Sequence, residues 1–343
     1  MQDIIFDDIG SFPIPETTTH EWMKNAFLNK DSNALLFSII NDTFQQKIDA
    51  GVQVPTYPQF QDMNLQFLDI INDDECVEEP FKVKEDCARI LELEAIEPAA
   101  SKYKKEHGKK LEIRICVTGP IELYLRLFGG TDYTDVLNLL ATSIDRFVKN
   151  SIKNAKNFNI KTIAIDEPSI GINPQIMFEE SDIISALTIA GDGAIKNGDV
   201  EIHLHSPLEY TLACESPSIN VVGIESASTP SHLELIDKQR LEQSDTFLRV
   251  GIARTDIFNL TTTLNEKYGV NVWKETKYLS KVVTELETPS AVKKRCYVAD
   301  SLFGDCIKYV GPDCGLGSWP SQDIASQLLN NVSKGIEEFK KGN

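Results

Sequence analysis

The feature that most constrains the fold of this chain is a repeated alternation of short apolar runs with longer stretches of helical periodicity. Each run has the length of a buried strand and ends in small or polar residues. Successive strands separated by helices must pair in parallel, because each connection is a crossover. About eight such units predict an α/β fold, a closed (β/α)8 TIM barrel, with an open doubly wound sheet as the alternative.

The predicted elements cover the sequence without a Pro-, Gly- or Ser-rich linker, so we expect residues 1–343 to form a single catalytic domain. The strands are expected at residues 4–9, 50–55, 111–117, 162–165, 200–205, 221–225, 247–252 and 307–311. The helices are expected at residues 17–29, 34–49, 87–107, 133–156, 179–195, 231–239, 273–286 and 323–340.

Charge and cysteine content narrow the class of function. The 34 Lys and Arg against 52 Asp and Glu give a net charge of −18, which would repel nucleic acids and anionic membranes. Seven Cys without a Cys-x-x-Cys spacing predict reduced thiols. Residues 1–10 lack the apolar core of a secretory signal, and no apolar run is long enough to span a membrane. We therefore expect a soluble cytoplasmic protein that acts on a small molecule or binds a basic partner.

Four side chains at predicted strand ends have the chemistry of a metal site. No G-x-G-x-x-G follows the first strand, and in a barrel the active site lies at the C-terminal strand ends. His203 and His205 stand at i and i+2, so a strand points both toward the same face. Glu225 ends the next strand and Cys314 follows the last one. This set suits a four-coordinate zinc ion, although the spacing alone also allows histidines that are only hydrogen-bonded.

Three short motifs stand at strand ends in a fixed order. Gly-Ser-Phe-Pro occupies residues 10–13, Asp-Glu-Pro occupies 166–168, and Gly-Pro-Asp-Cys-Gly-Leu occupies 311–316. This ordered set resembles the cobalamin-independent methionine synthases, over nearly the whole chain, and corresponds to the C-terminal catalytic barrel of the longer members. The resemblance implies zinc-dependent transfer of a methyl group to homocysteine, which gives methionine.

The resemblance also implies a ligand set for the zinc. The family's His-x-Cys pair, Glu and motif Cys correspond to His203, His205, Glu225 and Cys314. The chain departs from the family at His205, where the family usually has Cys. A neutral imidazole in place of a thiolate raises the formal charge of the site by one unit. Such a site is expected to lower the pKa of a bound thiol further and to leave its thiolate less nucleophilic.

The resemblance assigns the substrate amino acid to two of these motifs. The segment of Ile9, Gly10 and Ser11 would hold its carboxylate, while Asp166 would accept hydrogen bonds from its ammonium group, with Glu167 in a supporting role. From the residues alone, Ser11 could instead shape a turn, and Asp166 could cap the following helix.

The methyl donor is a further point of departure. The long family members use a methyltetrahydrofolate and protonate its leaving group with a His in an Asp-Ile-His-Ser-Pro stretch. The nearest counterpart here is Arg-Thr-Asp-Ile at 254–257, which makes Asp256 the candidate catalytic acid. An exposed Asp with a pKa near about 3.9 is a poor acid at neutral pH. A methylcorrinoid, either methylcobalamin or a corrinoid protein, needs no proton to leave and is the expected donor, with methyltetrahydrofolate as the alternative.

Other functions remain open at this point. Thr56 and Tyr57 occupy the neighbourhood of a Glu that the family uses to contact the substrate ammonium, so coenzyme M or another alkyl thiol is an alternative acceptor. A uroporphyrinogen-decarboxylase-like enzyme on the same barrel would need no zinc. A non-catalytic corrinoid-binding or metal-binding protein is the third alternative.

Overall fold

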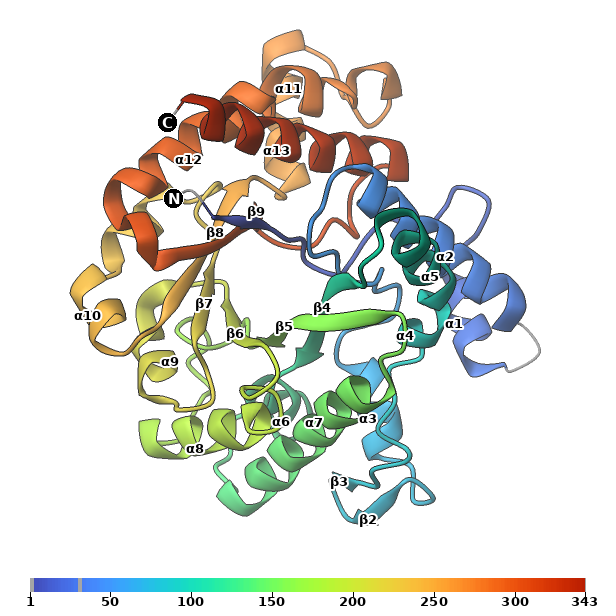
Figure 1. Cartoon of the computed structure of the whole chain (residues 1–343), viewed down its shortest axis with the longest axis vertical. Coiled ribbons are helices and arrows are strands. Elements are labelled where there is room, and N and C mark those ends of the chain that lie inside the picture. Colours follow the sequence, from blue (N-terminus) through green and yellow to red (C-terminus); the bar gives the residue numbers. More distant parts are fainter. Residues whose placement is uncertain (1–2, 30–32, 343) are drawn as a thin grey trace.

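The computed structural model describes residues 3–29 and 33–342, and its central element is a curled parallel sheet surrounded by helices (Figure 1). Seven strands form this sheet in the order β1-β9-β8-β7-β6-β5-β4. The strands are β1 (Ile5–Phe6), β4 (Leu111–Thr118), β5 (Phe158–Asp166), β6 (Asp199–Leu204), β7 (Val221–Ile224), β8 (Phe247–Ala253) and β9 (Ile307–Pro312). A separate antiparallel hairpin consists of β2 (Val77–Glu79) and β3 (Lys82–Val83).

The helices cover the outside of the sheet and connect its strands. The α-helices are α1 (His20–Leu28), α2 (Asn33–Asp49), α3 (Leu65–Ile71), α4 (Glu92–Ala95), α5 (Glu97–His107), α6 (Pro120–Phe128), α7 (Thr134–Asn154), α8 (Glu180–Gly191), α9 (Thr211–Glu215), α10 (Lys238–Gln243), α11 (Ile257–Tyr268), α12 (Pro289–Phe303) and α13 (Gln322–Gly342). Short 3-10 turns are η2 (Pro207–Glu209), η3 (Pro230–Leu235), η4 (Thr276–Tyr278) and η6 (Gly304–Cys306), and η5 (Val282–Leu286) is a π-helix.

Three predicted helices differ from the structure. The segment 87–107 divides into α4 and α5, because Pro98 in the first turn of α5 has no N–H to continue a helix from the preceding residues. The segment 231–239 becomes η3 followed by the start of α10, and 273–286 becomes η4 and η5. Helices α3, α6, α9, α11 and α12 were not predicted.

The predicted second strand, residues 50–55, is not a strand. Residues 54, 56 and 59 make only isolated bridges, to Asp7, Arg114 and Ser11 respectively. Pro55 and Pro58 interrupt this segment, and neither can donate to a ladder. Residues 54–59 nevertheless lie between β1 and β4, the two edges of the sheet. The described residues therefore form a seven-stranded sheet whose edges are joined by a non-strand segment.

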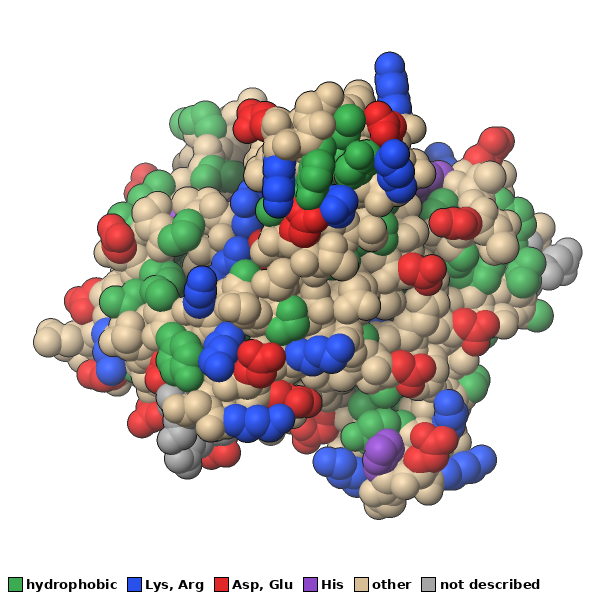
Figure 2. Space-filling view, turned by 90° about the horizontal axis from the view of Figure 1, so that it is seen from above, with side chains coloured by type: hydrophobic (Ala, Val, Ile, Leu, Met, Phe, Trp, Pro, Cys, Tyr) green, Lys and Arg blue, Asp and Glu red, His purple; other side chains and the backbone are tan. Residues whose placement is uncertain are grey.

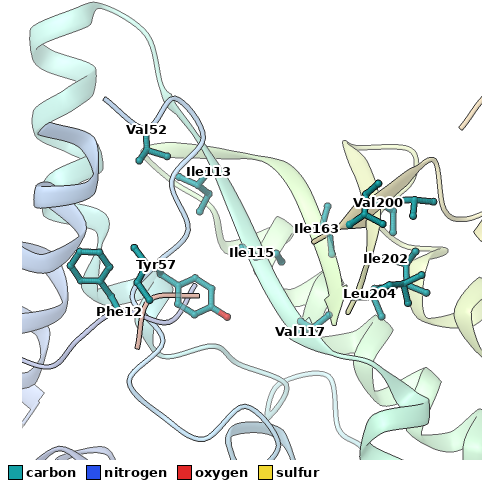
Figure 3. Packing of buried hydrophobic residues seen from close by; sticks show 14 of the residues in the cluster. Phe12, Val52, Tyr57, Ile113, Ile115, Val117, Ile163, Val200, Ile202 and Leu204 are labelled. Atoms are coloured by element: carbon teal, nitrogen blue, oxygen red, sulfur yellow. The ribbon is translucent and has the colours of Figure 1, made fainter. Parts of the chain in front are cut away.

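The outer face of the sheet is apolar. Figure 3 shows side chains of β4, β5 and β6 that pack in this layer: Ile113, Ile115, Val117, Ile163, Val200, Ile202 and Leu204. On β4 and β6 they fall at every second position, as expected when successive side chains point to opposite faces. The intervening positions must therefore face the inside of the curled sheet.

The inner face carries buried charges at those intervening positions. Arg114 on β4 donates to both oxygens of Glu201 on β6, and its Nη1 lies 2.8 Å from Asp7 Oδ2. Arg249 Nε on β8 donates to Asp7 Oδ1 at 2.8 Å. All four side chains are fully buried. Because these strands are not neighbours, the contacts require the sheet to curl around this ion cluster.

The surface offers no large single-sign patch on the face drawn in Figure 2, where acidic and basic side chains are interspersed. Among residues 3–29 and 33–342, no helix combines the length and the apolar character needed to cross a bilayer.

Candidate metal centre

Four potential metal ligands lie at the C-terminal edge of the sheet. His203 is the second-last residue of β6, and His205 follows that strand directly. Glu225 comes immediately after β7, which pairs in parallel with β6 and places Gly223 beside His203. Cys314 follows β9, two strands further along the sheet. Parallel pairing thus brings the four residues to one rim, although they span more than a hundred positions of the sequence.

The ligand atoms of these residues converge. One atom from each of His203, His205, Glu225 and Cys314 lies within 4.8 Å of all the others. Glu225 Oε1 is 3.4 Å from His205 Nε2 and 4.0 Å from His203 Nε2. Cys314 Sγ is 3.9 Å from His205 Nε2. Bonds of about 2.0–2.3 Å to a tetrahedral zinc place its ligand atoms roughly 3–4 Å apart, so this cluster is close to the size that one ion needs.

His203 is the member whose environment calls most clearly for a ligand. Its side chain is 3% exposed, and neither Nδ1 nor Nε2 has a hydrogen-bond partner. A buried polar atom without a partner costs roughly 1–3 kcal/mol. The residue sits in a strand where an apolar side chain would avoid that cost. The unpartnered nitrogens therefore fit a site in which His203 binds a metal ion.

Burial shifts the pKa of all four donors in the direction that favours their neutral forms. It lowers the pKa of His203 well below its usual value, with a further contribution from His205, and it lowers the pKa of His205. Burial raises the pKa of Glu225 to about 7, and burial with the nearby Glu225 carboxyl raises the pKa of Cys314. Neutral imidazoles have free lone pairs for a metal. A divalent cation would favour the ionised carboxylate and thiolate that burial disfavours.

Asp313 fixes the position of Cys314 relative to Glu225. Its carboxylate is 1% exposed. It accepts backbone hydrogen bonds from Ser226 and Ala227 at Oδ1 and from Ser228 at Oδ2, at 3.0, 2.8 and 2.7 Å. The loop that follows β9 is thereby tied to the loop that follows β7. Sequence reasoning quoted Asp313 within a motif but assigned it no role.

Two glycines allow the close packing beneath the cluster. A Cβ on Gly251 would lie 1.9 Å from Asp313 Oδ1, and one on Gly223 would lie 2.2 Å from Glu201 Oε1. A side chain at either position would displace one of these carboxylate oxygens from the hydrogen bond that it accepts from Arg114 or Ser226.

The segment predicted to bind the substrate carboxylate lies beside the loop of Cys314. The Ser11 carbonyl accepts from Leu316 N at 2.8 Å, and Ser11 Oγ accepts from Gly317 N at 3.3 Å. Gly10 packs against the side chain of Gln59, where a Cβ would lie 2.0 Å from its Oε1. Ile9 is buried. The structure thus brings the first and last motifs together at the same rim.

Asp166 and Glu167 have different environments although they are adjacent. Glu167 accepts from Ile121 N and Glu122 N, both at 2.9 Å, and so caps the N-terminus of α6. Asp166 is buried, and its Oδ1 has no hydrogen-bond partner. Burial raises the pKa of Asp166 to about 7, opposed by the charge of Arg114. The alternative role considered for Asp166 concerned the helix that follows β5, whereas Glu167 caps α6, which precedes β5 in the chain.

Asp256 is not one of the converging donors. Both of its oxygens accept from Arg254, at 2.9 and 2.7 Å, and Oδ2 also accepts from Asn259 at 3.1 Å. Partial burial acts to raise its pKa, but the hydrogen bonds from Arg254 and Asn259 outweigh it and lower the pKa. Asp256 is therefore held as a carboxylate and has no proton to donate at neutral pH.

Comparison with solved structures identifies the fold of the chain, whereas comparison of sequences finds no relative. No family model matches the sequence, and no curated protein sequence matches it. Among solved structures, a B12-independent methionine synthase from Shewanella sp. W3-18-1 in complex with selenomethionine matches with a TM-score of 0.63 at 13% identity, over 99% of this chain and 98% of that chain. The chain has the fold of the cobalamin-independent methionine synthases.

Two further structures agree with that result. A putative vitamin-B12 independent methionine synthase from Listeria monocytogenes matches with a TM-score of 0.55 at 15% identity, over 98% of both chains. A methyltransferase from Methanosarcina mazei matches with a TM-score of 0.55 at 11% identity, over 97% of this chain and 94% of that chain. Both matches run over nearly the full length of the chain and show the same fold.

Sequence reasoning missed residues that support this rim. The ring of His232, to which it gave no role, makes a 2.7 Å hydrogen bond between Nδ1 and the Glu225 carbonyl. Arg114 and Arg249, whose charges help to lower the pKa of His203, were also missed. Their only signal was a charged residue in the middle of an apolar run, which is unusual for a buried strand.

Proposed function

We propose that this chain is a zinc-dependent methyltransferase that methylates the thiol of homocysteine to give methionine. His203, His205, Glu225 and Cys314 would hold the zinc. The observation that carries the proposal is their convergence within 4.8 Å around the unpartnered nitrogens of His203. Zinc in this position would keep the substrate sulfur deprotonated and nucleophilic at neutral pH.

The neighbouring residues would hold the amino-acid part of the substrate. Ser11 and the backbone of Ile9 and Gly10 lie beside the Cys314 loop, where a carboxylate could accept their hydrogen bonds. Asp166 offers a buried oxygen without a partner, and an arriving ammonium group would favour its ionised form. Glu167 would act indirectly, by holding α6 against the end of β5.

The state of Asp256 favours a methylcorrinoid as the donor. A folate amine must be protonated as it leaves, whereas a methylcorrinoid leaves as a cobalt(I) species without a proton. Asp256 is held ionised by Arg254 and is a poor acid. The donor would be methylcobalamin or a methylated corrinoid protein, with methyltetrahydrofolate as the alternative.

Metal analysis tests the centre. We expect about one zinc per chain in the purified protein, and loss of this zinc in His203→Ala and Cys314→Ala. Cys214→Ser is the matched control, because Cys214 is half-buried on α9 and makes no part of the cluster, and it should keep its zinc. Zinc retained in both ligand variants would refute the proposed centre. A wild-type protein without zinc would instead favour a zinc-free enzyme, such as a uroporphyrinogen-decarboxylase-like protein.

A methylation assay tests the substrates. Zinc-loaded protein is supplied with homocysteine or coenzyme M, and with methylcobalamin, a methylated corrinoid protein or methyltetrahydrofolate. We expect methionine from homocysteine with a corrinoid donor, at a rate that Asp256→Asn leaves unchanged. Turnover with methyltetrahydrofolate but with neither corrinoid donor would refute the proposed corrinoid donor. Zinc binding without turnover from any donor would indicate a non-catalytic protein.

A further inference from the structure

Two cysteines far from the metal centre meet at the base of the β2–β3 hairpin. The hairpin is antiparallel, with Val77 opposite Val83. Lys84 N donates to the Cys76 carbonyl at 2.7 Å, which continues the pairing by one step. The Lys84 carbonyl then accepts from Cys87 N at 3.1 Å, so a turn brings Cys87 back toward Cys76. Their thiols lie within hydrogen-bonding reach of each other.

The environment of this pair differs from that of the core cysteines. Cys76 and Cys87 are both half-buried thiols, whereas Cys116 and Cys296 are buried. The hydrogen bond with Cys87, together with burial, raises the pKa of Cys76 to about 12, so Cys76 is the member that keeps its proton. The positive charge of Lys84 opposes this rise in the pKa of Cys76. Because both thiols are half-buried, the pair is accessible to a small oxidant.

We propose that Cys76 and Cys87 form a redox-active dithiol that closes to a disulfide by exchange with a low-molecular-weight disulfide such as oxidised glutathione. The Cys87 thiolate attacks one glutathione sulfur, which breaks the glutathione S–S bond and releases one glutathione thiolate. Cys76 then loses its proton and attacks the Cys87 sulfur, which releases the second glutathione. Two protein thiols are oxidised, and one glutathione disulfide is reduced to two glutathiones.

The hairpin can close this bond without disturbing the sheet. It is anchored on α7, where Val83 N donates to Ser143 Oγ at 2.9 Å, and Ser143 Oγ donates to the Phe81 carbonyl. Val83 is fully buried, so the anchored end is fixed while the cysteines stay at its half-buried edge. The modification is thus local, and Cys314 at the metal centre does not take part.

Oxidation of the whole protein with mass mapping tests the proposal. The protein is equilibrated with mixtures of reduced and oxidised glutathione, alkylated under denaturing conditions and digested. We expect the free thiols to fall from the seven of the sequence to five, with a single crosslink between Cys76 and Cys87 that dithiothreitol reverses. Hydrogen exchange should slow in residues 76–87 of the oxidised form.

Single substitutions separate this pair from unspecific oxidation. Cys76→Ser should stop at a glutathione adduct on Cys87, and Cys214→Ser should still form the crosslink. The proposal is overturned when wild-type Cys76 and Cys87 stay reduced while the half-buried Cys214 is glutathionylated, or when Cys87 keeps a glutathione adduct beside an intact Cys76. Circular dichroism checks that the variants fold. If a variant does not fold, the crosslink map of the wild-type protein is the test.

Discussion

Two clusters of ionisable groups, one fully buried and one partly exposed at the strand ends, differ in how well they are partnered. In the ion cluster, each carboxylate oxygen of Asp7 and Glu201 accepts a hydrogen bond from Arg114 or Arg249. In the metal-ligand cluster at the strand ends, both ring nitrogens of His203 are without one. Arg114 Nε and Arg249 Nη1 have no partner, but each guanidinium group of the ion cluster is paired with a carboxylate. Such ion pairs hold the fold together, whereas an imidazole with neither nitrogen partnered indicates a site for a ligand.

The largest effect is expected from His203→Leu, which removes one member of the unpartnered cluster. The variant should contain no bound zinc, and methyl transfer should fall by at least about a thousandfold, or about 4 kcal/mol of transition-state stabilisation. Its metal-free form should be at least as stable as the metal-free wild type, because a buried imidazole without partners is replaced by an apolar side chain of similar size. Zinc analysis and thermal unfolding after chelation measure the two results. A strongly destabilised metal-free variant would show that His203 is a structural residue.

A substitution in the ion cluster should instead destabilise the metal-free protein. Arg114→Met leaves the buried carboxylates of Asp7 and Glu201 without their main partner. Breaking a buried pair in this manner costs about 3–5 kcal/mol, measured as a loss in the free energy of unfolding of the metal-free protein in urea. Arg240→Met is the matched control, since its ion pair with Glu215 is largely exposed and contributes at most about 1 kcal/mol. Equal costs for both variants would contradict the distinction between the clusters.

Glu92 is an intermediate case, a fully buried carboxyl whose partners are neutral amides. Gln61 Nε2 donates to it at 2.8 Å and Gln66 Nε2 at 3.4 Å. Burial raises the pKa of Glu92 to about 7, above the value of about 4.3 in an unfolded chain. The folded state therefore binds this proton more tightly. Its contribution to the free energy of unfolding is fully present below about pH 4 and is lost as the pH rises through 7.

Glu92→Gln tests this pH dependence. Between pH 4 and 8 the free energy of unfolding of the wild type should fall by up to about 3 kcal/mol through Glu92. The variant should not show this fall, because its neutral amide has no proton to release. Gln66 Oε1, which has no partner, can accept from the new amide group. Urea unfolding of both proteins across this pH range gives the difference. Parallel stability curves would show that the Glu92 carboxyl ionises in the folded protein at little cost.

Three members of the metal-ligand cluster were predictable from local sequence patterns, whereas Cys314, which follows the last predicted strand, was assigned as a ligand mainly through the family resemblance. The i, i+2 spacing of His203 and His205, and the position of Glu225 at a strand end, follow from the period of a strand and the parallel order. Arg114 was not predictable as a partner of Asp7, since the sequence does not say which strands face each other across the interior. The Cys76–Cys87 pair was missed for a similar reason, because its proximity depends on a two-stranded hairpin.

The segment 50–55 shows how tertiary context overrides a local pattern. It reads as an apolar strand, yet Pro55 leaves Thr56 to bridge Arg114 alone, and Thr56 N is satisfied by Asp8 Oδ1 at 2.7 Å. Lys47 Nζ, 2.7 Å from Asp8 Oδ2, completes this buried arrangement. Side-chain hydrogen bonds thus supplement the few backbone bonds that this segment keeps with β1 and β4, where the sequence pattern predicted a full ladder.

The smallest effect is expected from His205→Cys, which restores the ligand that the resembling family has at this position. The substitution adds a thiolate next to Cys314 Sγ, which is 3.9 Å from His205 Nε2, and lowers the formal charge of a zinc site by one unit. A side chain that is 40% exposed can change without disturbing the core. The variant should keep about one zinc per chain, bind it up to about tenfold more tightly, and hold the substrate thiolate in a more nucleophilic state.

Competition with a chromogenic chelator measures this zinc affinity, and the rate of homocysteine methylation at saturating donor measures the nucleophilicity. His107→Cys is the control, because it adds a thiol at an exposed helix end, outside the cluster. A variant that loses zinc would mean that the imidazole of His205 is required by the geometry of the rim. The unpartnered cluster would then be built for a two-histidine centre, and the departure from the family would reflect a different acceptor thiol rather than an adjustment of the same chemistry.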